Sequence, residues 1–228
     1  MIRHPKVLAE ISKAALENNY EIIKKHTGMD QICVVKADCY GHGIECAGVF
    51  YECGCRVFAV SGTDEALELR AFFDKDGVHP DILIFGYVNP EDTPEIIEND
   101  IICAVFSRQF AELCAKNVPD GKKLRAHIKI NSGMNRIGFG PDQLDEALFS
   151  AKLPQIDCEG IFTHFACAGA ACGNWCGGGW CVWCLSWRGK CRRNLARRRE
   201  EPPGCVRSPL RNRRIAFGVA SIAMQPFA

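Results

Sequence analysis

The sequence predicts an α/β fold: an incomplete (β/α)₈ TIM-type barrel of about six strand–helix units, followed by a poorly structured tail. Short apolar runs alternate with helical stretches up to about residue 168 and start about every 20–35 residues, which is typical of βαβ units in a parallel sheet. No glycine-rich dinucleotide-binding fingerprint accompanies these runs, which favours a barrel over a doubly wound sheet. A complete barrel of eight units takes roughly 250 residues. The regular part of this chain, with about six units, is therefore predicted to form most of a barrel but not its end.

The first predicted element is a helix that Ser12 caps and that runs towards Lys25. Its apolar side is expected to consist of Ala15, Leu16, Ile22 and Ile23. Six apolar runs are the strand candidates: residues 32–35, 57–60, 82–85, 102–106, 124–130 and 159–163. Four helix candidates lie between them: residues 63–73, with Thr63 as the cap, and residues 93–99, 107–116 and 141–150.

The composition fits one globular domain of ordinary type. The chain has 228 residues, of which 47% are hydrophobic and 24% charged, enough for a sizeable core. The net charge of +1 does not indicate nucleic acid binding, and no apolar run is long enough to predict a transmembrane helix. The first residues are charged and amphipathic, unlike a signal peptide. We therefore expect a cytoplasmic protein with no membrane or nucleic acid partner.

The 15 cysteines fall into two groups. Nine lie between Cys33 and Cys167, within apolar stretches such as QICVV and IICAVF. We expect them to be small buried side chains in a reducing compartment. The other six lie between Cys172 and Cys205, where the composition is very different.

This change of composition occurs near residue 168. Up to Ala168 the chain has 17 Lys and Arg residues against 25 Asp and Glu, whereas from Gly169 onward it has 11 against 2. All four tryptophans lie between Trp175 and Trp187, and no tyrosine follows Tyr87. The chain is therefore divided into residues 1–168 and a Cys-, Trp- and Arg-rich tail, residues 169–228.

Three interpretations of the tail are open. Cys181 and Cys184 form one CxxC pair, but a structural zinc site usually has two such pairs at regular spacing, so no metal site is predicted. The segment RRNLARRRE could contact nucleic acid phosphates, although no aromatic or helical pattern organises it. Joint enrichment in Gly, Trp, Cys and Arg without periodicity is also what a GC-rich gene gives when translated out of frame. We favour this last interpretation, with a disordered or out-of-frame tail.

Polar residues are predicted at the C-terminal ends of strands, where barrel enzymes carry their active sites. In VVKADCYGHG, Lys36 ends the first strand and Tyr40 follows in a glycine-rich turn. A lysine at a barrel mouth, partly desolvated by the apolar wall, is a nucleophile able to form a Schiff base. A lone lysine at a strand end would more simply extend its amine to solvent.

Two further segments belong to the same predicted face. HIKINSGMNRIGFG, residues 127–140, contains Lys129 and places Arg136 in a glycine-flanked loop, which suits an anion clamp. GIFTHF, residues 160–165, ends the sixth strand on His164. Taken singly, Arg136 fits a surface salt bridge equally well, and a histidine such as His164 is more often a core residue than a site residue. Together with Lys36 they favour one shared site.

These three segments resemble bacterial alanine racemases. VVKADCYGHG is similar to the segment of that family that binds pyridoxal 5'-phosphate (PLP), and INSGMNRIGF and GIFTHFACA resemble two further family segments in the same order. The resemblance covers about residues 5–168, which we therefore expect to be a partial PLP-binding barrel. It implies an isomerase that interconverts L- and D-alanine for peptidoglycan, with a C-terminal β domain and a homodimeric assembly.

The resemblance also implies how the cofactor is held. Lys36 would form the Schiff base with PLP and act as one of two catalytic bases. Tyr40 would hydrogen-bond the phosphate, and His164 would pack beside the pyridine ring. Arg136 would lie near the phenolic oxygen of the cofactor.

Substrate contacts follow from the same resemblance. Arg136 and Met134 would contact the amino-acid substrate, and Lys129 matches a lysine that is carbamylated in some members. PLP acts as an electron sink when the Cα proton is removed, and racemisation then needs proton donors and acceptors on opposite faces. In the family a tyrosine from the partner's C-terminal domain serves the face opposite the lysine.

The chain departs from this pattern after residue 168. No tyrosine follows Tyr87, and the family's Ser/Asn phosphate segment and its pyridine-contacting arginine have no recognisable counterpart. We therefore expect unpaired strand edges, poor folding and at best weak racemase activity. The alternatives are another amino-acid racemase or decarboxylase on a PLP barrel, and a non-catalytic PLP-binding protein.

Overall fold

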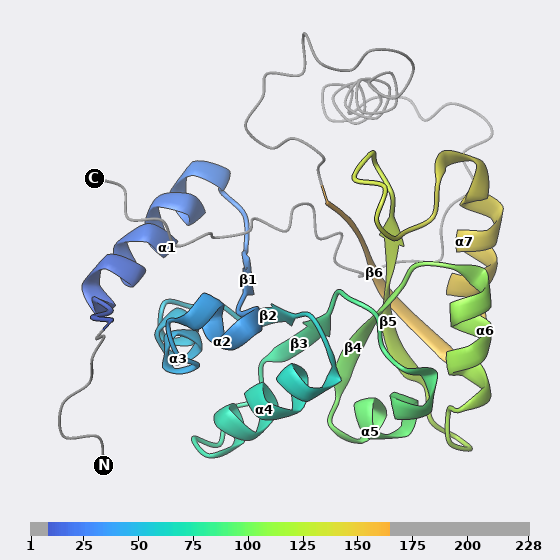
Figure 1. Cartoon of the computed structure of the whole chain (residues 1–228), viewed down its shortest axis with the longest axis horizontal. Coiled ribbons are helices and arrows are strands. Elements are labelled where there is room, and N and C mark those ends of the chain that lie inside the picture. The colour runs from blue at the N-terminus through green and yellow to red at the C-terminus, as the bar shows by residue number, and fades with distance from the viewer. Residues whose placement is uncertain (1–8, 165–228) are drawn as a thin grey trace, which may run out of the picture.

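Parallel strands in unbroken chain order form the framework of the molecule (Figure 1). The computed structural model describes residues 9–164. The strands are β1 (Ile32–Val34), β2 (Val57–Val60), β3 (Asp81–Ile84), β4 (Ile101–Val105), β5 (Leu124–Ile130) and β6 (Ile156–Thr163). Each pairs in parallel with the next, from β1 to β6. A doubly wound sheet would reverse its order, so the predicted incomplete barrel is confirmed.

Helices connect successive strands and cover the outer face of the sheet (Figure 1). They are α1 (Lys13–Thr27), α2 (Lys36–Gly41), α3 (Glu45–Glu52), α4 (Thr63–Asp74), α5 (Thr93–Glu98), α6 (Arg108–Lys116) and α7 (Leu144–Ala151), with the 3₁₀ turns η1 (Pro90–Asp92) and η2 (Pro141–Gln143). The predicted strands and helices are confirmed, with small displacements of their ends. The largest are at β6, which begins at Ile156 rather than at residue 159, and at α7, which begins at Leu144, after η2, rather than at residue 141.

The helix caps were predicted correctly at one position and incorrectly at another. Ser12 is the N-cap of α1, and its side chain accepts a hydrogen bond from the Ala15 N–H. The prediction that Thr63 caps α4 is wrong, because the N-cap is Gly62. The Thr63 hydroxyl donates instead to the Asp92 carboxylate at 3.0 Å, and so ties α4 to η1.

The buried side of α1 also differs from the prediction. Leu16 and Tyr20 are its buried residues and Ile23 is half-buried, a stripe with helical spacing. Ala15 and Ile22 lie outside this stripe, and Ile22 is 56% exposed. The prediction that these two residues face the core is therefore wrong.

Alternate residues of each strand pack on opposite faces of the sheet. The outer face, beneath the helices, carries the large hydrophobic cluster that contains Phe58, Ile82 and Cys103. The inner face carries a smaller buried cluster of Ile32, Val34, Ala59, Leu83 and Ile102. Six of the eight cysteines in the described residues are buried, which confirms their predicted role as small hydrophobic side chains.

An ionic cluster joins the strands at their N-terminal ends, away from the predicted site. The Arg125 guanidinium of β5 bonds Asp81 of β3 at 2.8 Å, Asp100 at 3.0 Å and Glu159 of β6 at 2.6 Å. One side chain thus fixes the relative positions of β3, β5 and β6.

The predictions for residues 169–228, including the boundary at residue 168, lie outside the described residues. Between residues 9 and 164, no helix is long and apolar enough to cross a membrane.

Candidate active site

Lys36 lies where β1 leaves the sheet and enters an unusual turn. Residues 37–40 all have φ between 50° and 57°, in the left-handed region, which costs roughly 1–2 kcal/mol for each residue with a side chain. This conformation brings Tyr40 back beside Lys36, whose Nζ is 5.8 Å from the centre of the Tyr40 ring. The sequence predicted a flexible turn here but not its handedness.

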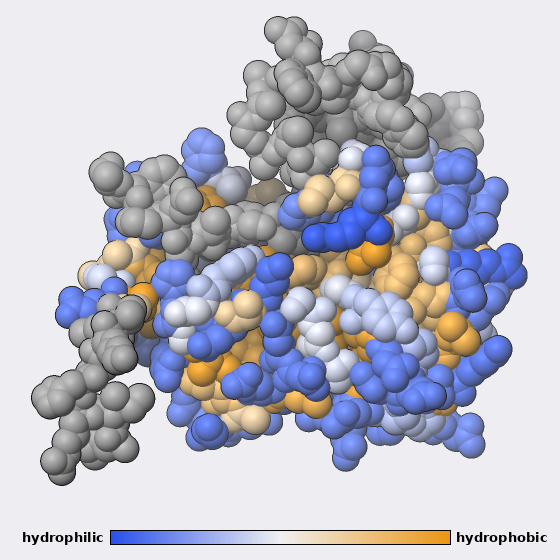
Figure 2. All heavy atoms as spheres, in the orientation of Figure 1, coloured by the Kyte–Doolittle hydropathy of each residue, from blue (hydrophilic) through white to orange (hydrophobic). Residues whose placement is uncertain are grey.

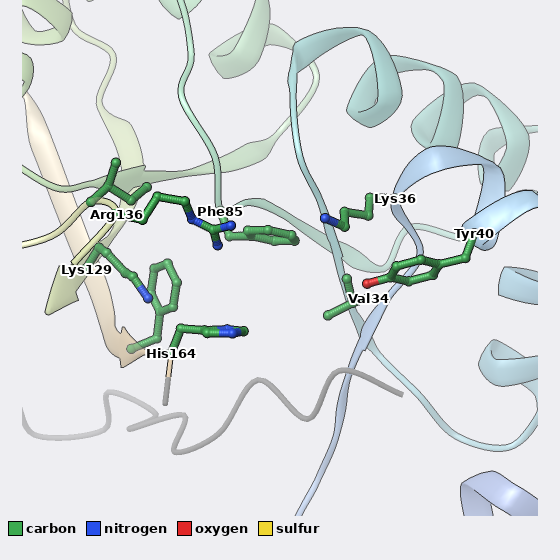
Figure 3. A pocket seen from close by; sticks show the side chains of 9 residues that line it. Val34, Lys36, Tyr40, Phe85, Lys129, Arg136 and His164 are labelled. Carbon is green, nitrogen blue, oxygen red and sulfur yellow. The ribbon is translucent and has the colours of Figure 1, made fainter. Parts of the chain in front are cut away.

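Arg136 is carried by a loop that folds back on the end of β5. The Asn131 N–H donates to the Phe139 carbonyl, and the Phe139 N–H donates to the Lys129 carbonyl, each at 2.9 Å. Gly138 makes this return possible, because its φ is +121° and a Cβ there would lie 2.8 Å from the Asn131 nitrogen. The loop therefore directs the Arg136 side chain across the end of the sheet (Figure 3).

His164 follows the end of β6 and is linked to the same loop. The hydroxyls of Ser132 and Thr163 lie 2.6 Å apart, and Thr163 also donates to the Ile130 carbonyl at 2.8 Å. The Ser132 oxygen also lies 3.3 Å from the backbone carbonyl of His164, a second acceptor within reach of its hydroxyl proton. These bonds join the loop that carries Arg136 to the strand end that carries His164.

Five of the six predicted site residues surround a cavity of about 210 Å³ at the C-terminal end of the strands. It is lined by Val34, Lys36, Tyr40, Phe85, Lys129, Arg136, Ile137, Phe162 and His164. In Figure 3, Lys36 and Tyr40 lie on one side, with Lys129, Arg136 and His164 on the other. Met134 lies in the Arg136 loop but is 38% exposed and is not among these lining residues.

Four lining residues were not predicted from the sequence: Val34, Phe85, Ile137 and Phe162. Phe85 directly follows β3, so its place at a strand end was a usable signal. The Lys36 Nζ lies 5.8 Å from the Phe85 ring centre. The other three are apolar residues in strands or loops, and nothing in their local sequence separates them from core residues.

The basic side chains of the cavity are Lys36, Lys129 and Arg136. None of the lining residues within the described part of the chain is acidic. Lys129 is only 5% exposed, with its Nζ 4.6 Å from the Phe162 ring centre. Burial, together with the nearby Arg136 charge, lowers the pKa of Lys129 to about 8.

Two further ionisable residues of the cavity, Tyr40 and His164, have pKa values shifted in favour of their neutral forms. Burial, and then the positive charges of Lys129, Arg136 and Lys36, lower the pKa of His164. Burial, and then the Glu65 carboxylate, raise the pKa of Tyr40. At neutral pH the cavity therefore offers cationic groups, a neutral imidazole and a hydroxyl donor.

Comparison with known proteins points to one family. The model of the alanine racemase N-terminal domain matches residues 11–174. Alanine racemase from Methanococcus maripaludis is 38% identical over 172 residues, which cover 73% of this chain and 45% of that protein. The chain thus spans less than half the length of this relative.

Solved structures agree with the sequence comparison. Alanine racemase from Bacillus anthracis, solved with bound L-Ala-P, has a TM-score of 0.64 and 28% identity, and the match covers 80% of this chain and 46% of that one. A histidine racemase from Leuconostoc mesenteroides matches the fold, with a TM-score of 0.71 and 23% identity over 94% of this chain and 53% of that one. The chain described here belongs to the alanine racemase N-terminal domain family.

Proposed function

We propose that this chain binds PLP at the mouth of the barrel and takes part in the interconversion of L- and D-alanine. The observation that carries the proposal is the cavity itself: Lys36, Lys129 and Arg136 converge between aromatic and apolar walls, without an acidic side chain among the described lining residues. Such a site suits an anionic ligand with a flat ring. PLP has a phosphate, a phenolic oxygen and an aldehyde that a lysine can bind, so the residues fit the cofactor.

Each residue has a proposed part in holding PLP. Lys36 Nζ would bind the aldehyde carbon, and the Tyr40 hydroxyl would donate to the phosphate. Arg136 would donate to the phenolic oxygen, and the neutral His164 ring would lie beside the pyridine. The rings of Phe85 and Phe162 would limit the access of water.

The chemistry follows from those positions. When bound, PLP supplies an electron sink that makes the Cα–H of an amino acid acidic. As a free amine, Lys36 Nζ would take or return the Cα proton on its own face of the substrate. Arg136, with Met134 from the same loop, would orient the substrate carboxylate.

Lys129 is proposed to be carbamylated. Its lowered pKa, about 8, leaves about one amine in ten neutral at pH 7. The neutral amine can form an N–C bond with CO₂ and release one proton. The product is an anion, so its electrostatic interaction with the Arg136 charge changes from repulsive to attractive.

The relationship with alanine racemases extends the proposal to the cell. We propose a cytoplasmic, homodimeric enzyme that supplies D-alanine for peptidoglycan.

Incubation of the full chain with PLP tests the proposal. We expect a visible absorbance band for the lysine-bound cofactor, and borohydride reduction should attach PLP at Lys36. Lys36→Ala should lose the band. A wild-type chain without lysine-bound PLP would contradict the proposal.

The reaction is tested in D₂O. Deuterium at Cα of alanine, with slower exchange for L-serine and L-lysine, would support alanine racemisation. Faster exchange of another amino acid would indicate a different racemase, and release of CO₂ would indicate a decarboxylase. Bound PLP without any exchange would indicate a non-catalytic PLP-binding protein.

A further inference from the structure

One carboxylate joins the ends of the two strands that lead into the site. Glu65, in the first turn of α4, accepts a hydrogen bond from the Ala37 N–H at 2.8 Å through Oε1. Its Oε2 accepts from the Ser61 N–H at 2.8 Å and from the Ser61 hydroxyl at 2.7 Å. Ala37 directly follows Lys36, and Ser61 directly follows β2. The carboxylate therefore bridges β1 and β2 at the point where the chain leaves the sheet.

These bonds replace the next two bonds of the parallel ladder. The register pairs Val34 with Ala59, and the Val35 N–H still donates to the Ala59 carbonyl at 2.9 Å. In a continued parallel ladder, the Ser61 N–H would donate to the Val35 carbonyl, and the Ala37 N–H to the Ser61 carbonyl. Both N–H groups donate to Glu65 instead. The hydrogen-bonded pairing of β1 with β2 therefore stops here, and the Glu65 carboxylate accepts from both N–H groups that the pairing would have used.

The replacement also makes the left-handed turn possible. The Val35 carbonyl, released from the ladder, accepts a hydrogen bond from the Cys39 N–H at 3.1 Å. Cys39 is 1% exposed and anchors the middle of the turn in the core. The Gly43 N–H then closes the turn on the Asp38 carbonyl at 3.0 Å. A backbone held in the left-handed region needs such surrounding support to persist.

The electrostatics favour the ionised form of Glu65. Burial alone would raise its pKa, but the hydrogen bonds from Ser61 and Ala37 and the charge of Lys36 outweigh burial, so the pKa is lowered. A carboxylate can accept from both strand ends at once, whereas an amide has one acceptor oxygen.

We infer that Glu65 is a positioning residue of the PLP site: its carboxylate sets the left-handed turn that aims Lys36 at the aldehyde and Tyr40 at the phosphate. The inference rests on the proposed function. Glu65 lies outside the set of cavity-lining residues and acts through the backbone of the turn.

The full-length Glu65→Gln variant tests this inference, with Glu68→Gln as the matched control. Glu68 is an exposed residue of the same helix. We expect Glu65→Gln to raise the PLP dissociation constant about tenfold, the effect of one lost charge-assisted hydrogen bond. At saturating PLP, the visible circular dichroism per lysine-bound cofactor should also change, because a misplaced turn reorients the ring. A loss of global stability alone would leave that signal unchanged.

Amide hydrogen exchange gives a readout that does not need PLP. In Glu65→Gln, the amides of Ala37 and Ser61 should exchange faster, and in Glu68→Gln they should not change. If the wild type fails to bind PLP at Lys36, the proposed function fails, and exchange still decides whether the carboxylate holds the turn. If wild type and Glu65→Gln bind PLP with equal affinity and equal dichroism, the inference is overturned while the proposed function stands. Unchanged exchange at both amides would also overturn it.

Discussion

At the scale of single residues, burial gives Lys129 its distinctive chemistry. The sequence places Lys129 and Arg136 in one segment, but it does not show that the lysine is 5% exposed. Because the charged amine is desolvated and faces a second cation, its pKa falls to about 8. Lys129 is therefore the lysine that we expect to react with CO₂.

This expectation can be checked by ¹³C NMR of the full chain in labelled bicarbonate. A carbamate signal should be present at pH 8 and should weaken as the pH falls below about 8, because protonation removes the reactive amine. Lys129→Gln should lose the signal. The exposed Lys152 supplies the control, and a signal lost in Lys152→Gln but kept in Lys129→Gln would contradict the assignment.

At the scale of elements, the loop that carries Arg136 depends on one glycine. In Gly138→Ala, the new Cβ would lie 2.8 Å from the Asn131 nitrogen and 2.9 Å from the Ile130 carbonyl carbon, at a φ of +121°. We expect a loss of about 2–3 kcal/mol in the free energy of unfolding, measured in urea. Gly121→Ala is the control, since its φ is +73° but its Cβ would meet nothing within 4 Å. It should cost about 1 kcal/mol, and equal losses would refute the steric argument.

The ionic cluster at the opposite end of the strands is a second test at this scale. Arg125→Met would leave Asp81, Asp100 and Glu159 without their shared cation. We expect a destabilisation of about 3 kcal/mol at neutral pH, because partly buried carboxylates would be left uncompensated. Arg108→Met removes an exposed pair with Glu112 and a cation–π contact with the Phe149 ring, whose centre is 4.0 Å away, and should cost only about 1 kcal/mol. Similar costs in urea unfolding would show that the cluster does not hold the strands.

At the scale of the whole molecule, the described part of the sheet has two open edges. Within residues 9–164, β1 and β6 each pair with one strand only. Apolar side chains also reach the surface, and Figure 2 shows them (orange) among polar residues. On α7, for example, Leu148 is 57% and Phe149 40% exposed. Unpaired parallel edges and exposed apolar surface favour association between copies.

We therefore expect the full chain to associate as its concentration rises. Light scattering coupled to size-exclusion chromatography should show a mass that increases with concentration. A monomeric mass that does not change with concentration would contradict this expectation.

Much of the fold and part of the site could be predicted from the sequence, because local patterns decide them. Alternating apolar runs and helical stretches determined the strands and their barrel class. The ends of those strands, and the loop that follows the fifth, determined the choice of Lys36, His164 and Arg136. Two predictions were wrong because contacts between distant side chains decide the outcome. The Thr63 hydroxyl bonds Asp92 instead of capping α4, and Ile22, predicted on the buried side of α1, faces away from the core.

By itself, then, the sequence determined the order and type of the elements, the family, and which polar residues end the strands, since each depends on residues close together in the chain. Only the tertiary structure decided the handedness of the turn after Lys36, the burial of Lys129 and the part played by Glu65. In VVKADCYGHG nothing distinguishes a left-handed turn from any other flexible one. The turn is set by a carboxylate 28 residues further along the chain, and such a contact exists only once α4 has packed against the ends of β1 and β2.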